Sequence, residues 1–112
     1  MKVSEIPAFI GGTCVQTLYT DTDIQSVYTS DLLSDVLGNA PDNCILITIQ
    51  AHRNTVAVAT TKDSPAIIVC NDRPIPADMI SAAEQEHIAV FLTDKNQYTI
   101  SGMLYKKLDG AR

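Results

Sequence analysis

The sequence predicts an α/β protein with a single-domain, three-layer-like fold, in which helices cover a mostly parallel central sheet. Residues 44–49, 66–70 and 87–92 are continuous apolar, largely β-branched runs, which are typical of strands buried on both faces. Segments with helical spacing separate and follow these runs, and alternation of strand and helix implies parallel strands joined by right-handed crossovers. With 112 residues the chain has room for one core, so we expect one domain over 1–112.

The region before the first apolar run predicts two short helices and two short strands. Residues 4–12 form the first helix, which Ser4 caps and a glycine pair ends. Residues 14–20 and 24–29 have strand composition and flank a polar turn. The second helix follows, with Leu33, Val36 and Leu37 on one stripe, Ser30 as its cap and Asp31 in its first turn.

Residues 55–61, "TVAVATT", have the local propensity of a strand. We predict a helix there, because two neighbouring buried strands need a covering element between them. A further helix begins near Pro76 and another covers the C-terminal region. Their apolar stripes consist of Met79, Ile80 and Ala83, and of Ile100, Met103, Leu104 and Leu108.

Composition excludes several classes of protein. A net charge of −5 and scattered basic residues argue against nucleic-acid binding. No apolar run approaches the roughly 18 residues that cross a bilayer, and the N-terminus does not resemble a signal peptide, so we expect a cytoplasmic protein without a membrane partner. The cysteines Cys14, Cys44 and Cys70 lack disulfide or zinc spacing, and we expect Cys44 and Cys70 to be buried. We expect no metal and no cofactor.

Polar residues follow the predicted parallel strands, where open α/β sheets bind ligands. The residues at these ends are Ser30, Asp31, Gln50, His52, Arg53, Asn54, Asn71, Asp72, Arg73, Thr93 and Asp94. Each has an ordinary explanation as a helix cap or a loop residue, and only their convergence indicates a site. As ligand-binding residues we select Ser30, Asp31, Gln50, His52, Asn54, Thr93 and Asp94.

Two features allow more than one interpretation. Asp31 and Asp35 would bind magnesium with a further oxygen ligand such as Asp94, but the spacing fits a solvated helix face better. His52 directly follows a buried strand, where a histidine contacts a phosphate, acts as a general base, or caps the next helix. A small phosphoryl-handling enzyme or phosphoprotein using His52 with Asp31 or Asp94 is therefore the alternative function.

Catalytic motifs are missing from the sequence. It contains no GxxxxGK[ST], no GxGxxG and no GxSxG, and no Cys stands beside a His in a familiar arrangement. We therefore predict no catalytic residues and a protein that is not an enzyme.

The stretches "YTSDLLSDVLGNAP", "ILITIQAHRNTVAVATTKDSPAIIV" and "AAEQEHIAVFLTD" resemble the DRTGG domain family, in its short stand-alone form. The resemblance covers nearly the whole chain and implies the fold shared by the N-terminal domains of HPr kinase/phosphorylase and of Mur ligases such as MurF. The segment "TDIQSVYTSD" stands where the family has its Asp-Arg-Thr-Gly-Gly element, without the arginine and glycines. The kinase P-loop lies outside the related domain.

DRTGG domains occur beside CBS domains in some pyrophosphatases and in some phosphotransacetylases, which implies a regulatory or ligand-sensing role. We expect a small ligand, a nucleotide or another phosphorylated molecule, or a partner protein. We also expect a homodimer, because parallel sheets need both faces covered. The C-terminal helix, with Tyr98, Met103 and Tyr105, is the candidate interface.

Overall fold

The computed structural model describes residues 1–110, in which five strands form one sheet. The order across the sheet is β1-β5-β4-β3-β2; β2 to β5 are parallel neighbours, and β1 is antiparallel to β5. The strands are β1 (Thr13–Gln16), β2 (Ser26–Thr29), β3 (Cys44–Thr48), β4 (Ala66–Val69) and β5 (Ala89–Leu92). The predicted mostly parallel sheet is confirmed.

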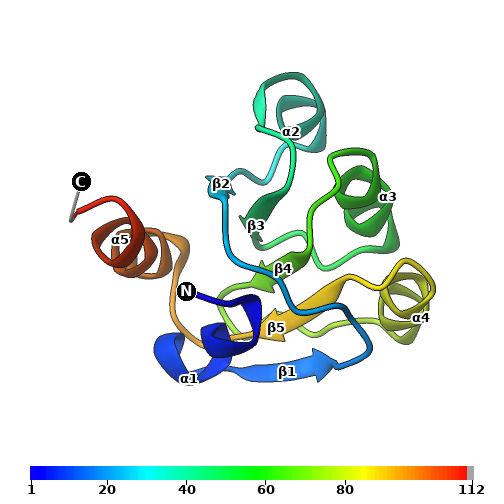
Figure 1. Ribbon diagram of the computed structural model, residues 1–112. Helices are drawn as coiled ribbons and strands as arrows, with labels where there is room; N and C mark the ends of the chain where they lie inside the picture. Colours follow the sequence, from blue (N-terminus) through cyan, green and yellow to red (C-terminus); the bar gives the residue numbers. More distant parts are fainter. Residues whose placement is uncertain (111–112) are drawn as a thin grey trace.

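Helices cover both faces of this sheet. Helices α2, α3 and α4 lie on one face and α1 and α5 on the other, which gives three layers (Figure 1). The helices are η1 (a 3₁₀ helix, Val3–Glu5), α1 (Ile6–Ile10), α2 (Leu33–Asn39), α3 (Arg53–Thr61), α4 (Ala77–Gln85) and α5 (Gln97–Leu108). The three-layer fold is confirmed.

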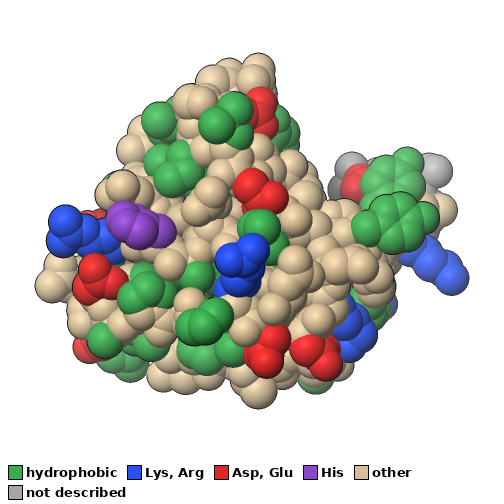
Figure 2. Space-filling model, turned by 180° about the vertical axis from the view of Figure 1, so that it is seen from behind, with side chains coloured by type: hydrophobic (Ala, Val, Ile, Leu, Met, Phe, Trp, Pro, Cys, Tyr) green, Lys and Arg blue, Asp and Glu red, His purple; other side chains and the backbone are tan. Residues whose placement is uncertain are grey.

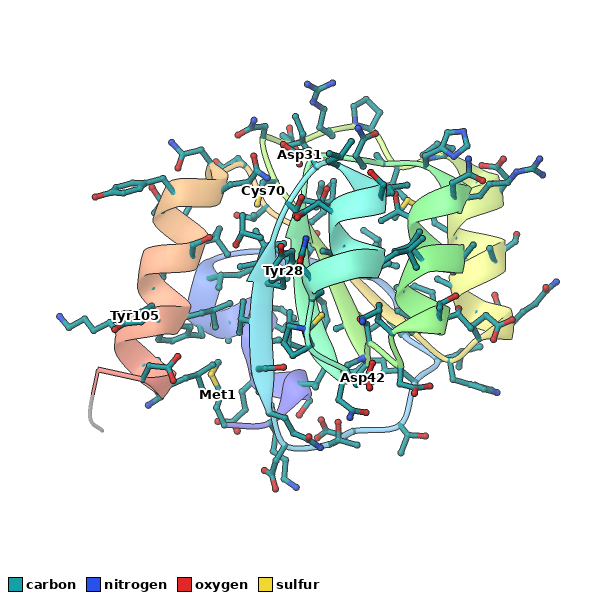
Figure 3. The ribbon with its side chains drawn as sticks, turned by 90° about the horizontal axis from the view of Figure 1, so that it is seen from above. Met1, Tyr28, Asp31, Asp42, Cys70 and Tyr105 are labelled. Atoms are coloured by element: carbon teal, nitrogen blue, oxygen red, sulfur yellow. The ribbon has the colours of Figure 1, made fainter. Side chains whose placement is uncertain are left out.

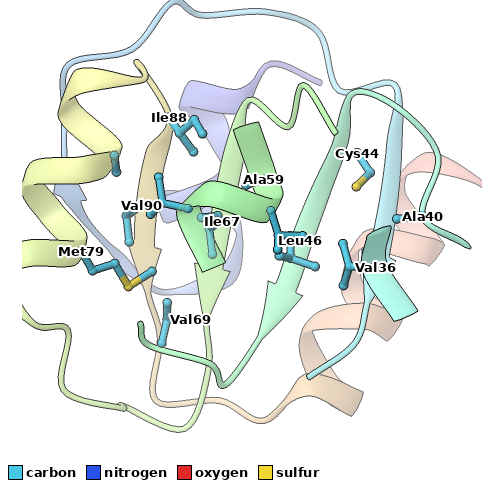
Figure 4. Close-up of a cluster of buried hydrophobic side chains, with 13 residues drawn as sticks. Val36, Ala40, Cys44, Leu46, Ala59, Ile67, Val69, Met79, Ile88 and Val90 are labelled. Atoms are coloured by element: carbon cyan, nitrogen blue, oxygen red, sulfur yellow. The ribbon is translucent and has the colours of Figure 1, made fainter. Parts of the chain in front are cut away.

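Two hydrophobic cores fill the spaces between the layers. Successive side chains of a strand point to opposite faces, so Leu46 enters one core while Ile45 and Ile47 enter the other. This double burial explains why β3, β4 and β5 are apolar at nearly every position. Figure 4 shows the core beneath α2, α3 and α4, where Val36 and Met79 meet the strands. Cys44 and Cys70 are buried as expected, one in each core.

Residues 55–61 lie in helix α3, which confirms the prediction against their local propensity. Val56, Val58 and Ala59 pack into the core over the sheet. The Thr60 hydroxyl donates to the Val56 carbonyl oxygen at 2.9 Å, within the helix. The energy of burying an apolar helix face therefore exceeds the weak preference of β-branched residues for strands.

The predicted starts of two helices are wrong. Ser4 does not cap the first helix; its backbone N–H and its hydroxyl both donate to the Asp21 carboxylate, at 3.0 and 2.6 Å. Ser30 does not cap the second, because α2 begins at Leu33 and Leu32 is its N-cap. Asp31 therefore lies before the helix, and its carboxylate makes contacts with β3 and α5.

Candidate functional site

The carboxyl ends of β2, β3, β4 and β5 lie together at one end of the sheet because these strands are parallel. We call the loops that follow them, residues 30–32, 49–52, 70–76 and 93–96, the carboxyl-end rim. Figure 2 looks onto this end of the molecule and shows charged side chains of both signs among hydrophobic ones. The rim therefore offers hydrogen-bond donors and acceptors rather than a field of one sign.

Asp31 connects two loops of the rim to the start of α5. Its Oδ1 accepts hydrogen bonds from the Thr48 hydroxyl at 3.0 Å, the Ile49 N–H at 2.8 Å and the Gln97 side-chain amide at 2.9 Å. Figure 3 shows Asp31 at the point where β2 leads into α2. The carboxylate thus joins the β2–α2 loop to the end of β3 and to the first residue of α5.

A second set of bonds joins the loops after β4 and β5. Asn71 and Asp72 have φ of +60° and +51°, in the left-handed region. Their backbone N–H groups donate to the carbonyl oxygens of Lys95 at 3.0 Å and Thr93 at 2.8 Å. These bonds offset the cost of about 1–2 kcal/mol per residue that left-handed backbone imposes on non-glycine residues. The rim loops are therefore tied to one another as well as to the strands.

His52 is the N-cap of α3. Its Nδ1 accepts from the Asn54 N–H at 3.0 Å, and both side chains are exposed. Within residues 1–110, the hydrogen bonds of His52 include none to a carboxylate, and Asp31 Oδ1 is taken by its three donors. This geometry is that of a helix cap and does not favour a histidine–carboxylate pair.

The remaining predicted residues differ in how accessible they are. Gln50 and Asp94 are exposed on their loops. Thr93 is 2% exposed, and its hydroxyl oxygen accepts from the Lys95 N–H at 3.2 Å, so this side chain shapes the turn. Ser30 is half-buried, and its Oγ accepts from the Leu32 N–H at 3.2 Å. A ligand on the rim would therefore contact Gln50, His52, Asn54 and Asp94 most directly.

Cys70 lies at the carboxyl end of β4, close to Asp31 in Figure 3. Burial, and to a smaller extent the Asp31 carboxylate, raises the pKa of its thiol to about 11. The thiolate is the nucleophilic form of cysteine, so this thiol stays protonated and unreactive near neutral pH.

Asp35 is not simply solvated, contrary to the prediction. It is half-buried, and its carboxylate accepts from the Tyr28 hydroxyl at 2.7 Å and the Asn39 side-chain amide at 2.8 Å. These hydrogen bonds, the Tyr28 bond first, lower the pKa of Asp35. Asp35 therefore fastens α2 to β2. Across residues 1–110, no three His, Cys, Asp or Glu side chains are grouped to hold a metal ion.

Two surface grooves border the rim. One, of about 510 Å³, lies between α3 and α4 and includes Arg53 and Asn54. The other, of about 590 Å³, runs between β2 and α5 and is lined by side chains that include Tyr98 and Tyr105. The second groove contains none of the predicted ligand-binding residues.

Thr48 and Gln97 were not among the predicted site residues, although both bind Asp31. Thr48 is the one hydroxyl-bearing residue at the end of the apolar strand β3, so the sequence could have indicated a polar role for it. Gln97 lies 66 residues from Asp31, and no local pattern connects the two.

A mostly parallel sheet with three crossover helices on one face and a loop-built rim at the carboxyl ends of its strands defines a small α/β domain. The family described as HPr Serine kinase N terminus matches residues 47–108, and the chain belongs to this family. The match includes Gln50, His52, Asn54, Thr93 and Asp94 but begins after Asp31.

One curated relative is an HPr kinase/phosphorylase of Streptococcus uberis, 44% identical over 48 residues. The match covers 43% of this chain and 16% of that protein, so the chain corresponds to a small part of the kinase.

A solved structure has a similar fold, with a TM-score of 0.72 and 13% identity over 91% of this chain and 45% of that one. It contains the CBS and DRTGG domains of the regulatory region of Clostridium perfringens pyrophosphatase, complexed with the activator diadenosine tetraphosphate. The expected resemblance to DRTGG domains and to the N terminus of HPr kinase is confirmed. No helix within residues 1–110 has the length and hydrophobicity needed to cross a membrane.

Proposed function

We propose that residues 1–112 act as one DRTGG-like regulatory module, without catalytic activity, that senses a nucleotide or another small phosphorylated ligand at the carboxyl-end rim. Gln50, His52, Asn54 and Asp94 contact the ligand from the exposed side. Ser30, Asp31 and Thr93 hold the loops in position beneath it.

The observation that carries this proposal is the triple hydrogen bond to Asp31 Oδ1. It links the rim to the first residue of α5, so a ligand that rearranges the rim changes the support of that helix. A sensor needs such a connection, because a ligand shifts an equilibrium only by interacting differently with two states. The hydrogen bonds of Asp31 hold the rim loops in one defined conformation in the absence of ligand.

The comparisons support the direction of this proposal. The relatives are the N-terminal part of a kinase and the regulatory region of a pyrophosphatase, and the latter is complexed with a nucleotide activator. His52, Arg53 and Arg73 supply donors suited to phosphate oxygens. We further propose that the module works in the cytoplasm, since its three free cysteines suit a reducing compartment. We also propose that it works as a homodimer.

A thermal-shift screen tests the ligand proposal. The panel contains adenine and guanine nucleotides, diadenosine tetraphosphate, nucleotide-sugars, phosphorylated metabolites and divalent metal ions. A ligand at one hundred times its dissociation constant adds about 2.7 kcal/mol, which raises the melting temperature by several degrees in a domain of this size. An absence of any shift across the panel contradicts the proposal.

The choice of variants separates binding from stability. His52→Asn keeps a side-chain acceptor at the cap of α3, so it removes the imidazole with little change in stability. Asp94→Ala changes an exposed side chain. If either variant loses the ligand-induced rise in melting temperature, the result supports the rim as the binding site. If the rise is unchanged in both variants and also in Asn54→Ala, the ligand binds elsewhere. Ser81→Ala on the exposed side of α4 is the matched control.

A further inference from the structure

The two edges of the sheet differ in how they are protected. At one edge, β1 pairs with β5 through an irregular register between Cys14 and Gln16, and such irregularities blunt an edge. At the other edge, β2 is regular, and its sequence Ser-Val-Tyr-Thr has neither charge nor proline. The β2 edge therefore lacks these devices that discourage pairing with another chain.

Two residues of β2 direct their backbone polar groups to this open edge. Ser30 donates its N–H inward to the Ile47 carbonyl oxygen, at 3.1 Å. Backbone groups alternate along a strand, so Tyr28 also points toward β3 while Val27 and Thr29 point outward. The edge thus presents the N–H and C=O groups of Val27 and Thr29, on either side of Tyr28.

Exposed hydrophobic side chains gather beside the same edge. Of the five large ones exposed within residues 1–110, Leu32 and Leu37 belong to α2 or its cap, and Tyr98 and Tyr105 belong to α5. Tyr98 is 89% exposed and Tyr105 is 68% exposed. Figure 2 shows hydrophobic side chains on α5, which projects from the body of the molecule. A surface of this kind, next to an unpaired strand, fits a protein interface.

The outer face of α5 carries a stripe of four residues with a tyrosine at each end. Tyr98 and Tyr105 flank the small residues Ser101 and Gly102, so the pattern of large and small side chains is the same in both directions. All four line the groove between β2 and α5. A side chain added at Gly102 would meet nothing within 4 Å, so packing within this chain does not require the glycine. The surface between the two tyrosines is therefore open at Gly102.

The strand and the helix are in contact at the middle of the α5 stripe. The Thr29 and Ser101 hydroxyl oxygens are 2.7 Å apart, which places the middle of this stripe at Thr29, the last residue of β2 and the neighbour of Tyr28. A single two-fold axis can therefore relate both elements to their copies at once.

We propose that a second copy of this chain docks here about that axis, extending the homodimer proposed above to a defined interface. The two β2 strands pair antiparallel about Tyr28, so that Val27 of each copy lies opposite Thr29 of the other. This register gives four backbone N–H···O bonds, because both residues present outward groups. The two α5 helices run antiparallel, with Tyr98 of each copy against Tyr105 of the other.

The surface formed by β2 and α5 is complementary to itself, and this property favours a second copy of the chain as the partner. An isologous interface requires that one surface complement itself, and both the strand register and the α5 stripe do so. The area indicates a concentration-dependent dimer. Helix α5 is about 18 Å long and the three layers span about 20 Å, so each copy contributes less than the roughly 800 Å² typical of stable complexes.

Sedimentation velocity from low micromolar to near-millimolar concentration, without any ligand, tests the proposal. The wild-type chain shifts from 12.1 kDa toward twice that mass as concentration rises. Gly102→Glu weakens association at least tenfold, because it fills the open surface at Gly102 and places two like charges near the axis. Ser81→Glu, which adds the same charge on α4, associates like the wild type. A wild-type chain that stays monomeric, or a Gly102→Glu variant that dimerises normally, overturns the proposal.

Oxidative cross-linking gives an independent readout of the interface. Gly102→Cys places a thiol near the axis, whereas the native Cys44 and Cys70 are buried. We expect a disulfide-linked dimer in this variant and little in Ser81→Cys. Equal cross-linking of the two variants contradicts the interface. Because these experiments contain no ligand, their outcome is separate from that of the thermal-shift screen.

Discussion

The side chains of Asp31 and Gln97 meet across 66 residues of sequence, with the Gln97 amide donating to Asp31 Oδ1 at 2.9 Å. Asp31 follows β2, and Gln97 opens α5 on the other face of the sheet. This bond brings the start of α5 to the rim, where the ends of the parallel strands lie. It is the contact through which a rim ligand would affect the helix.

Replacement of Asp31 by alanine removes the acceptor for three donors. The Ile49 N–H, the Thr48 hydroxyl and the Gln97 amide each lose their partner. Hydrogen bonds to charged groups contribute about 1.5–3 kcal/mol, and donors left unpaired add a cost. We expect Asp31→Ala to lower the free energy of unfolding by about 2–4 kcal/mol in urea denaturation.

Asp94→Ala is the control for this loss, because Asp94 is exposed on the same rim. We expect a change within about 0.5 kcal/mol for it. Equal effects of the two substitutions would show that the Asp31 bonds do not stabilise the loops.

Substitutions of His52 test whether this residue serves as the N-cap of α3. In His52→Ala the Asn54 N–H loses its acceptor, which costs about 1 kcal/mol as for other N-caps. His52→Asn retains an acceptor, so its melting temperature should stay near that of the wild type. Thermal denaturation of both variants followed by circular dichroism checks this. A loss as large in the asparagine variant as in the alanine variant would rule out capping as the role of His52.

The bond between Tyr28 and Asp35 predicts a pH dependence in acid. The pKa of Asp35 is lowered, first by the Tyr28 hydroxyl. A lowered folded-state pKa contributes stability above the unfolded value of about 3.9, and this contribution is lost as the pH falls through the folded value. In Tyr28→Phe the pKa of Asp35 should rise towards its ordinary value. The pH range over which acid removes this contribution should then narrow, because the folded and unfolded pKa values of Asp35 lie closer together.

Carbon NMR titration of the side-chain carboxyl groups measures this shift directly. Asp21, whose pKa is lowered first by its bond from the Ser4 hydroxyl, is an internal control that Tyr28→Phe should leave unchanged. A constant Asp35 titration in the variant would contradict the assigned cause.

Thiol accessibility tests the buried layer under the rim. The pKa of Cys70 is raised to about 11, mainly by burial, and burial also raises the pKa of Cys44. At pH 8 both thiols should react with a thiol-specific disulfide reagent only as fast as the domain unfolds, and rapidly in denaturant. Rapid labelling of Cys70 in the native protein, identified by mass spectrometry, would show that the rim opens to solvent.

The buried elements of the fold could be predicted from the sequence, and the polar ones only in part. Continuous apolar runs identify β3, β4 and β5, and the need to cover both faces identifies α3 although "TVAVATT" favours a strand locally. The start of α2 was misplaced because a Ser-Asp pair before an apolar stripe has the composition of a cap. Asp31 instead binds Gln97, and a contact so distant in sequence leaves no local pattern.

The β2–α5 surface was predictable only as a hydrophobic helix face. Tyr98 and Tyr105 stand out in the sequence, and both are exposed. The open edge of β2 depends on the order of the strands, and its alignment with α5 depends on the bond between Thr29 and Ser101. Neither can be derived without the three-dimensional arrangement.

Amide hydrogen exchange, with and without ATP or diadenosine tetraphosphate, tests the central claim most directly. The account predicts slower exchange in residues 49–54 and 93–97 when a nucleotide that shifts the melting temperature is present. It also predicts a change in the first turn of α5, through Asp31 and Gln97. Unchanged exchange at the rim, or protection confined to residues 56–60 and 82–86 in the groove between α3 and α4, would contradict it.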